Sequence, residues 1–598
     1  MSTRAVGIDL GTTFSAIGHL NKHGVPEILH SAEGDRITPS VILFDGDEVV
    51  VGNYARQSAV VYPEQVVEFI KRHMGEEGYT FAYRGIEYSP EDLSGFVLAK
   101  LKHDAELRLG YRIDQAVITV PAHFGEAERQ ATLRAGEAAG LEVLKLLNEP
   151  TAAAYAYGLQ NVGENQVALV FDLGGGTFDV TVIRIDGRDI HVLGTTGDHQ
   201  LGGKDWDDVL IRHVAARFEE RHGIDPLSDL AAYHDLRQKC VSAKISLTRR
   251  PVIRLFYDYK GKVLREEISR EIFEDLTAGL LRRCESLLLD LLDEIGVSTT
   301  EVDTVILAGG STRMPMVREM LDGIFHMAPA TDINPDECIA LGAALSAAIE
   351  SAEAKGLEPE VDLRTHDVTS HSLGMVVYRE EALFNSKIIR RNSRIPNERT
   401  RDEYVTTHDG QTTMDLWLVQ GENDSPIECN VLGHFEFYGI PPRPQGESTL
   451  AVTFRYNPNG IVEVEAMDLK SGQTLPHRLA SGSATLEDLA SDRVPIHIAL
   501  LMDCSGSMYG QSIDDARVAA EAFGQHSLAP GRQVAVVGFP GGILAPLTSD
   551  PERLRTALGT MTAIGSTPMA GGLQAQPLFE FVVQVADCQG AHRALLGG

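Results

Sequence analysis

The sequence is poor in cysteine and in basic residues, and it has no apolar run long enough to cross a bilayer. Its six cysteines are Cys240, Cys284, Cys338, Cys429, Cys504 and Cys588. They form no Cys-x-x-Cys pair and are too sparse for a disulfide framework, which favours a reducing, cytoplasmic location. The N-terminus reaches Asp9 before any long apolar stretch, so we expect neither a signal peptide nor a membrane span.

The shortage of positive charge limits the possible partners. The chain carries 53 Lys and Arg against 85 Asp and Glu, a net charge of −32. This balance argues against binding to the phosphate backbone of nucleic acid or to an anionic membrane surface. The apolar share of 43% and charged share of 23% are ordinary for folded proteins, and 598 residues predict several domains.

The first region, to about residue 356, alternates strand patterns with helical ones. Apolar runs at 5–10, 166–171 and 304–308 each lead into a Gly-rich loop, and a further apolar run at 116–120 stops at Pro121. Residues 126–141 have the composition of a helix. Strands feeding Gly-rich turns with helices between them indicate an α/β architecture.

One pattern occurs twice in this region. Ile8–Thr13 and Phe171–Thr177 both run from a strand through Asp and a tight Gly turn to a hydroxyl residue. The repeat suggests a duplication whose two halves face one ligand. Glycine loops can bring backbone N–H groups close to phosphates, and Asp9 with Asp172 could hold a hydrated Mg²⁺.

The rest of the chain predicts two further domains. Residues 351–365 are polar and acidic, as in a linker, and 366–480 show the short alternating runs of an antiparallel all-β domain. A second linker is expected over 480–493. The region 494–598 begins with a nearly continuous apolar run at 495–502, which predicts a buried parallel strand. A helix at 512–525 and a strand at 533–539 would make this region α/β.

The first region contains a series of further short motifs. They are Gly7–Thr13, Val120–Phe124, Arg129–Thr132, Asn148–Ala154, Phe171–Asp179, Leu201–Gly203, Gly309–Pro315, Asn334–Glu337 and Gly342–Ala344. In type and in order, these motifs closely resemble those of the Hsp70 (DnaK) chaperone family. The resemblance implies a multidomain chain that starts with an actin-like ATPase of two lobes over residues 1–356. It also implies ATP or ADP and Mg²⁺ as the bound cofactors.

The resemblance assigns roles to individual residues. It implies catalytic roles for Lys71, Glu149, Asp172 and Thr177, which would place the attacking water, the metal and the γ-phosphate. Nucleotide and metal contacts are implied for Asp9, Gly11, Thr12, Thr13, Gly174, Gly175, Gly176, Asp179, Gly202, Gly203, Lys244, Thr248, Gly309, Gly310, Ser311, Arg313 and Asp336. Pro121 and Arg129 match a switch that reports the nucleotide state. Without the resemblance, Lys71 and Arg129 would be read as solvated helix residues and Pro121 as a strand stop.

Some positions depart from the family pattern. Val241 and Ile245 replace charged residues of the helix that contacts adenosine, which removes an Arg able to stack on adenine. We therefore expect weaker adenine binding or a changed base preference. Lys204 stands where the family has Glu. The linker over 360–365 is mostly polar where the family has leucines.

The middle region resembles the Hsp70 substrate-binding β-sandwich through Asp367–Gly374, Leu418–Glu422, Gly439–Pro442 and Asn459–Glu465. Such a domain binds extended apolar peptides. Candidate pocket residues are Met375, Val377, Phe435, Leu450 and Val452, with ordinary sandwich core as the alternative for each. The helical lid that follows the sandwich in the family is not recognised in this sequence, so bound peptide would be expected to leave quickly.

In the last region, Asp503, Ser505 and Ser507 follow an apolar strand in an Asp-x-Ser-x-Ser pattern. This pattern resembles the metal-ion-dependent adhesion site of von Willebrand factor A domains, which have a doubly wound α/β fold. Thr567 matches that family's distant threonine ligand. These oxygen ligands suit Mg²⁺. The family's later acidic ligand has no counterpart near 594–598, which predicts a truncated domain or an incomplete metal site.

The sequence is compatible with more than one function. The leading one is an Hsp70-like ATPase chaperone that engages polypeptides, with a J-domain co-chaperone and a nucleotide exchange factor as implied partners. The second is a nucleotide-gated scaffold that presents the A domain to a partner, favoured by the polar linker. A sugar kinase on the same fold is disfavoured, because the middle region offers no sugar site.

Overall fold

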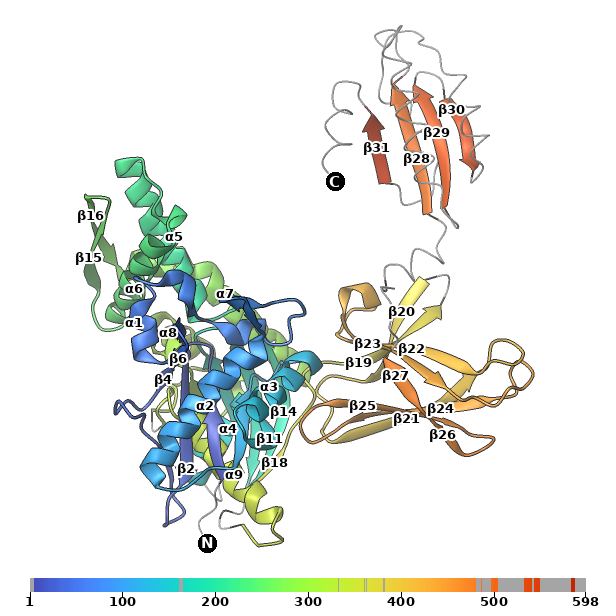
Figure 1. The fold of residues 1–598 in the computed structure, drawn as a ribbon, viewed down its shortest axis with the longest axis horizontal. Helices are drawn as coiled ribbons and strands as arrows, with labels where there is room; N and C mark the ends of the chain where they lie inside the picture. The colour runs from blue at the N-terminus through green and yellow to red at the C-terminus, as the bar shows by residue number, and fades with distance from the viewer. Residues whose placement is uncertain are drawn as a thin grey trace. The chain divides into compact units, whose positions relative to one another are not determined.

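The computed structural model describes residues 5–160, 165–331, 333–359, 361, 363–379, 382–479 and 486, together with four strands between 496 and 586. The chain divides into two compact units, and Figure 1 labels their helices and strands. The first contains Met1–Gly374, Lys387–Glu422 and Glu436–Arg478, and the second contains Met375–Ser386, Asn423–Phe435 and Leu479–Gly598. Within the described ranges, every helix is too short or too polar to span a bilayer.

Two sheets of similar design form the centre of the first unit. One has the order β11-β10-β1-β2-β3, and the other has the order β17-β12-β13-β14-β18. The strands of the first are β1 (Ala5–Asp9), β2 (Phe14–Leu20), β3 (Pro26–Ile28), β10 (Gln115–Val120) and β11 (Glu142–Asn148), with β4 (Thr38–Pro39) added to β2. The strands of the second are β12 (Asn165–Leu173), β13 (Phe178–Asp186), β14 (Asp189–Asp198), β17 (Thr304–Ala308) and β18 (Arg364–His366).

The pairing of these strands confirms the internal duplication. β1 is parallel to β10 and antiparallel to β2, and β12 is likewise parallel to β17 and antiparallel to β13. Asp9 ends β1, and Asp172 lies next to the end of β12. The two predicted Asp loops therefore leave equivalent strands of two related halves.

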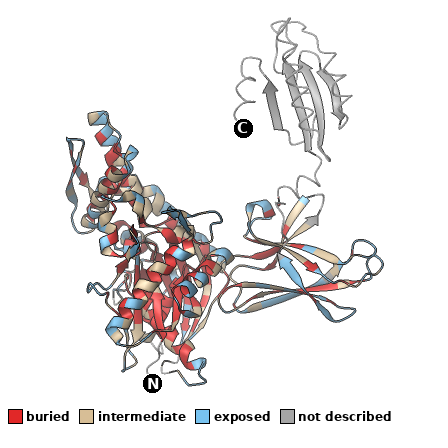
Figure 2. Cartoon of the chain, viewed as in Figure 1, coloured by how far each residue is buried: buried red, intermediate tan, exposed pale blue. Residues whose placement is uncertain are grey.

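Helices α4 (Glu149–Gln160) and α9 (Cys338–Glu353) lie between the two sheets, and their contact is close. A Cβ on Gly342 of α9 would lie 1.7 Å from the carbonyl oxygen of Ala152 on α4, so only glycine permits this approach. Figure 2 shows the buried residues concentrated on these sheets and helices. The core thus fixes both halves relative to each other inside the first unit.

Further helices and hairpins surround this centre. The first half adds β5 (Ile42–Asp45), β6 (Glu48–Val51), β7 (Val66–Val67), β8 (Phe81–Tyr83), β9 (Ile86–Tyr88), α1 (Asn53–Ser58), α2 (Pro90–Leu109) and α3 (Glu126–Ala138). The second half adds α5 (Gly203–His222), α6 (Leu230–Leu247), β15 (Val252–Tyr259), β16 (Lys262–Ser269), α7 (Arg270–Ile295) and α8 (Pro315–Phe325). Trp206 on α5 is fully buried beside Phe171 and Phe178. The helix expected over 126–141 is confirmed as α3, which ends three residues earlier.

The middle region forms the expected antiparallel β structure. β21 (Asn397–Val405), β24 (Thr449–Tyr456), β25 (Val462–Asp468) and β26 (Gln473–Leu475) make one sheet. The other sheet contains β19 (Leu373–Arg379), β20 (Ala382–Ile389), β22 (Thr413–Gln420), β23 (Asn430–Tyr438) and β27 (His477–Leu479). Of the candidate pocket residues, Leu450, Val452 and Met375 are buried, whereas Val377 and Phe435 are half-buried.

The linker expected over 351–365 is shorter than predicted. Ser351 and Ala352 are buried in the last turn of α9, so the helix continues into the predicted linker. Residues 364–366 form β18, which pairs in parallel with β14. Because backbone groups make this pairing, the polar side chains of the linker do not prevent it.

In the C-terminal region, four strands have the order β30-β29-β28-β31. β28 (Ile496–Asp503) is parallel to β29 (Arg532–Phe539) and to β31 (Val582–Ala586), and β30 (Gly542–Thr548) is antiparallel to β29. The predicted parallel strand at 495–502 is thus confirmed. Asp503 is the last residue of β28, while Ser505, Ser507, Thr567 and the helix expected at 512–525 lie outside the described residues.

Candidate functional site

A cleft of about 790 Å³ opens in the first unit where the three Gly-rich loops meet. Of the residues assigned to the nucleotide, those that line it are Asp9, Gly11, Thr12, Thr13, Lys71, Glu149, Asp172, Gly174, Gly175, Thr177, Gly203, Lys244, Thr248, Gly309, Gly310, Ser311, Arg313 and Asp336. Gly176, Asp179 and Gly202 are not among the lining residues. Asp179 is buried, and Gly176 and Gly202 pack against each other.

The two Asp loops interlock at the floor of this cleft. A Cβ on Gly175 would lie 1.8 Å from Oγ1 of Thr13, and a Cβ on Gly176 would lie 2.4 Å from Cγ2 of Thr12. Neither position can carry a side chain without moving the opposite loop. Glycine is therefore required here by the approach of the two halves, in addition to the flexibility that a turn needs.

The start of α5 holds the second loop in place. The backbone N–H of Gly203 donates to the carbonyl oxygen of Gly174 at 2.9 Å, and that of Lys204 donates to Gly175 at 2.8 Å. The Arg72 guanidinium donates to the carbonyl oxygen of Gly176 at 2.7 Å. The loop is thus fixed before any ligand binds, which reduces the ordering cost of binding.

Lys71 and Glu149 form a buried ion pair at the centre of the cleft. Lys71 lies on the short helix η2 (Ile70–His73), and Glu149 is the first residue of α4. Their side chains are 5% and 6% exposed, and the Lys71 ammonium donates to Oε1 of Glu149. Lys71 is therefore not a solvated helix lysine. Because the Lys71 ammonium is buried, it can interact only with groups inside the cleft.

Four carboxylates gather around this single lysine. Burial raises the pKa of Asp9, and burial together with Glu149, Asp179 and Asp9 raises the pKa of Asp172 well above its ordinary value. Burial also raises the pKa of Glu149 to about 7, although Lys71 opposes the shift. Buried carboxylates that lie close together disfavour each other's ionised form. Ionisation of all four carboxylates therefore requires positive charge in addition to that of Lys71.

The donor set fits a hydrated Mg²⁺. Oδ2 of Asp172 and Oδ2 of Asp179 are buried without a hydrogen-bond partner among the described residues. Buried carboxylate oxygens of this kind are hard ligands suited to Mg²⁺ or to its bound waters. Asp9 also lines the cleft, and its Oδ1 accepts a hydrogen bond from Thr119 Oγ1 at 3.2 Å.

His123 also belongs to this site, although no role could be assigned to it from the sequence. Its Nδ1–H donates to Oδ1 of Asp179 at 2.7 Å, and its backbone N–H lies 3.3 Å from the same oxygen. Burial disfavours the charged imidazole, but the carboxylates led by Asp179 outweigh burial and raise the pKa of His123. The sequence feature that could have indicated His123 is its position just after Pro121, where β10 ends.

The opposite end of the cleft is more open. Ile245 of α6 is 61% exposed and lines the cleft with Val241 and Thr248. Lys244 donates to the carbonyl oxygen of Gly203 and pairs with Asp207, both at 2.8 Å, while Arg313 pairs with Asp336 at 2.5 Å. No described residue of α6 places a guanidinium on this wall except Arg237, which lies 4.6 Å from the Phe69 ring centroid and pairs with Glu68.

Lys204 and Arg129 both have partners. The Lys204 ammonium pairs with Asp208 at 2.5 Å and lies 5.3 Å from the Phe69 ring centroid. Arg129 is 5% exposed and donates to Oδ1 of Asn148 at 2.7 Å and to the carbonyl oxygen of Asn459 at 3.1 Å. Reading Arg129 as a solvated helix residue is therefore wrong, because it joins α3 to the turn before β25.

Comparisons with known proteins show the family of this chain. The model of the Hsp70 protein family matches residues 5–81 and 76–496. A chaperone protein DnaK of Halobacterium salinarum is 41% identical over 493 residues, covering 81% of this chain and 76% of that protein. A chaperone protein DnaK of Thermotoga neapolitana is 42% identical over 478 residues, covering 78% and 79%. The chain therefore belongs to the Hsp70 family and is an ATPase of the Hsp70 type.

Proposed function

We propose that this chain is an ATP-driven chaperone whose cleft binds Mg²⁺-ATP and whose β-sandwich binds extended polypeptide. The observation that carries the proposal is the buried Lys71–Glu149 pair among Asp9, Asp172 and Asp179. A buried lysine that lies among several carboxylates, next to two Gly loops, suits phosphate groups held with a divalent ion.

Positioning and electrostatics account for the chemistry of this site. Thr12 and Thr13 supply hydroxyls on the first loop, and Thr177 supplies one at the start of β13. Lys71 stabilises negative charge on the outermost phosphate and orients the attacking water, while Glu149 holds Lys71 and can accept a hydrogen bond from that water. Asp9, Asp172 and Asp179 would hold a magnesium ion or its bound waters, and that ion would supply further positive charge.

Contacts inside the first unit support coupling between ATP and peptide. Arg129 joins α3 to Asn459, and Oε2 of Glu126 accepts the backbone N–H of Val462 at 2.7 Å. The Asn148 side chain, adjacent to Glu149, donates to Oδ2 of Asp367 at 2.8 Å. A change at Glu149 can therefore reach the start of the sandwich at Asp367 and the turn at Asn459 through direct contacts.

The finer assignments complete the proposal. We infer three domains at 1–356, 366–480 and 494–598, with the last resembling a von Willebrand factor A domain. The parallel arrangement of β28 with β29 and β31, with Asp503 at the carboxyl end of β28, supports this assignment. Asp503, Ser505, Ser507 and Thr567 would hold Mg²⁺ there. The absent lid, a cytoplasmic location, and partnership with a J-domain co-chaperone and an exchange factor stay predictions.

Single-turnover ATP hydrolysis tests the assignment. Lys71→Ala should lower the rate of cleavage by a factor on the order of 100 to 1,000, because a buried charge facing the phosphate is lost. Lys22→Ala, at an exposed lysine, is the control and should leave the rate unchanged. An unfolded peptide should alter the wild-type rate. Equal rates for Lys71→Ala and wild type would refute the catalytic assignment, and indifference to peptide would refute the coupling.

A further inference from the structure

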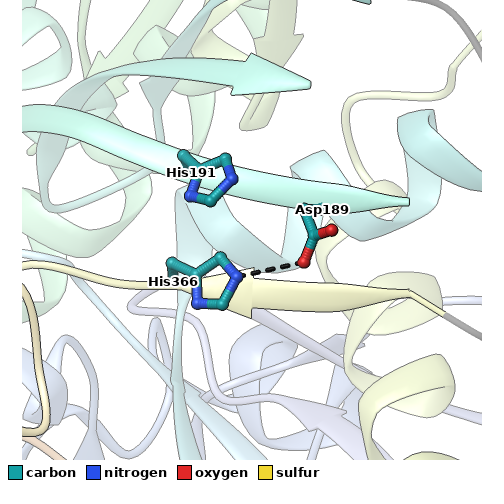
Figure 3. A group of neighbouring side chains, drawn as sticks. All are labelled: Asp189, His191 and His366. Carbon is teal, nitrogen blue, oxygen red and sulfur yellow. Dashed lines mark hydrogen bonds and ion pairs between the residues drawn. The ribbon is translucent and has the colours of Figure 1, made fainter. Parts of the chain in front are cut away.

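Three potential metal ligands meet at the edge of the second sheet, outside the nucleotide cleft. Asp189 and His191 lie two residues apart on β14, so they share one face of the strand. His366 lies on β18 directly opposite His191 in the parallel register. Figure 3 shows the three side chains on the same side of the paired strands.

The donor atoms are close enough to surround one ion. One donor atom from each residue lies within 4.8 Å of the others, and the two imidazole centroids are 4.5 Å apart with nearly parallel rings. Around a tetrahedral zinc ion, with bonds of roughly 2.0–2.1 Å, donor atoms lie about 3.4 Å apart. Rotation of the half-exposed rings can supply this difference, which is at most about 1.4 Å. Among the residues that the structure describes, no other group of three such ligands was found.

We propose that Asp189, His191 and His366 bind one zinc-class divalent cation, which fastens the linker strand β18 to β14. Two imidazoles and one carboxylate with a fourth position open to water favour Zn²⁺, Co²⁺ or Ni²⁺ over Mg²⁺. The side chains of Asp189 and His366 are 39% and 24% exposed, so the ion can reach them from solution.

The hydrogen bonds of His366 show how the free site is arranged. Its Nε2–H donates to Oδ1 of Asp189 at 3.1 Å, and its Nδ1 accepts from the Arg394 guanidinium. Binding of a metal through Nε2 requires the proton to lie on Nδ1 instead, where Arg394 cannot remain a donor partner. The exposed Arg394 side chain therefore competes with the metal, and Arg364, opposite Asp189, adds a second positive charge.

An ion bound by these three residues would link two strands that are far apart in the sequence. Asp189 and His191 precede His366 by 177 and 175 residues, and His366 immediately precedes Asp367, which accepts hydrogen bonds from Asn148 and Thr151. β18 is only three residues long, so few backbone hydrogen bonds hold it. An ion shared by the two strands would oppose separation of β18 from the sheet edge.

Cobalt binding to the untagged, full-length chain tests the site. The protein is stripped with a chelator and kept in excess Mg²⁺, which occupies the oxygen-ligand sites, before Co²⁺ is added. We expect one equivalent of Co²⁺ with the visible absorption of a four-coordinate ion, displaced by Zn²⁺. His366→Ala and His191→Ala should each weaken binding by a factor on the order of 100. His103→Ala, at an exposed histidine of α2, is the control and should leave the titration unchanged.

Arg394→Ala separates metal binding from general damage to the fold. This variant should bind Co²⁺ several-fold more tightly than wild type, because the competing guanidinium is gone. A gain of affinity cannot arise from misfolding. Binding that is indifferent to His191→Ala and His366→Ala, or the absence of a four-coordinate spectrum in both wild type and Arg394→Ala, would overturn the site.

Limited proteolysis tests the fastening of the linker. Trypsin can cut after Arg364, inside β18, and mass spectrometry identifies this cut among others. Zn²⁺ should slow that cut about tenfold in wild type and have no effect on it in His366→Ala. If Zn²⁺ binds to the three residues but the cut after Arg364 proceeds at the same rate, the role in fastening β18 is wrong.

Discussion

The two ends of the nucleotide cleft differ in burial and in charge. At the end formed by the Asp loops, Lys71, Glu149 and Asp172 are each about 5% exposed, and every loop is held by backbone hydrogen bonds. At the end formed by α6, Ile245 is 61% exposed and contributes no charge. From this difference we infer that the phosphate end supplies most of the binding free energy and the catalytic groups, while the base is held loosely.

The largest effect is expected where the two loops interlock. Gly175→Ala places a Cβ 1.8 Å from Oγ1 of Thr13, so one phosphate loop must move. Overpacking of this kind costs roughly 1–3 kcal/mol, and we expect affinity for Mg²⁺-ATP to fall on the order of 100-fold. Gly279→Ala makes the same chemical change on α7, where nothing lies within 4 Å, and should leave the affinity unchanged. Equal affinities in calorimetry would show that the loops do not form the phosphate site.

A smaller effect concerns the pH dependence of stability at the phosphate end. The pKa of Glu149 is raised from 4.5 to about 7, so the folded, nucleotide-free chain holds this proton more tightly than the unfolded chain. Protonated Glu149 therefore contributes to the free energy of unfolding. This contribution is fully present below pH 4.5 and is lost as the pH rises through about 7. Glu149→Gln should therefore be more stable than wild type at pH 7.5 by about 1 kcal/mol or more, with the difference shrinking toward pH 5. Urea unfolding at several pH values measures it, and a constant difference would contradict the burial argument.

The smallest effect is expected at the base end. Ile245→Arg adds a guanidinium to the α6 wall at an exposed position, where it can lie over a purine ring. Such a contact is worth roughly 0.5–2 kcal/mol, so affinity for Mg²⁺-ATP should rise several-fold. Ile272→Arg on α7, at another exposed isoleucine, is the matched control. A loss of affinity in the first variant would mean that the purine does not lie beside α6.

The same contrast explains what the sequence could predict. Asp9, Asp172 and the Gly loops were predictable, because strand, turn and ligand residue are contiguous and occur twice. Burial of Lys71 and Arg129 was not, since their partners Glu149 and Asn459 lie 78 and 330 residues away. β18 was missed because Arg364, Thr365 and His366 have no apolar alternation, and strand pairing there depends on the free edge of β14.

The histidine cluster shows the same limit. His191 and His366 are isolated in the sequence and become neighbours only through the register between β14 and β18. His123 likewise gains its role from Asp179 on a strand of the other half. In contrast, the Asp-x-Ser-x-Ser pattern at Asp503 was visible in the sequence, but two of its three ligands and Thr567 lie outside the described residues.

The most direct measurement compares the binding of Mg²⁺-ATP, Mg²⁺-GTP and adenosine to the same wild-type chain by calorimetry. If the phosphate end dominates, GTP should bind within about tenfold of ATP, since the base contributes only roughly 1 kcal/mol of discrimination. Adenosine should bind more weakly than Mg²⁺-ATP by a factor on the order of 1,000 or more. Adenosine binding that approaches that of Mg²⁺-ATP, or strict rejection of GTP, would contradict the account.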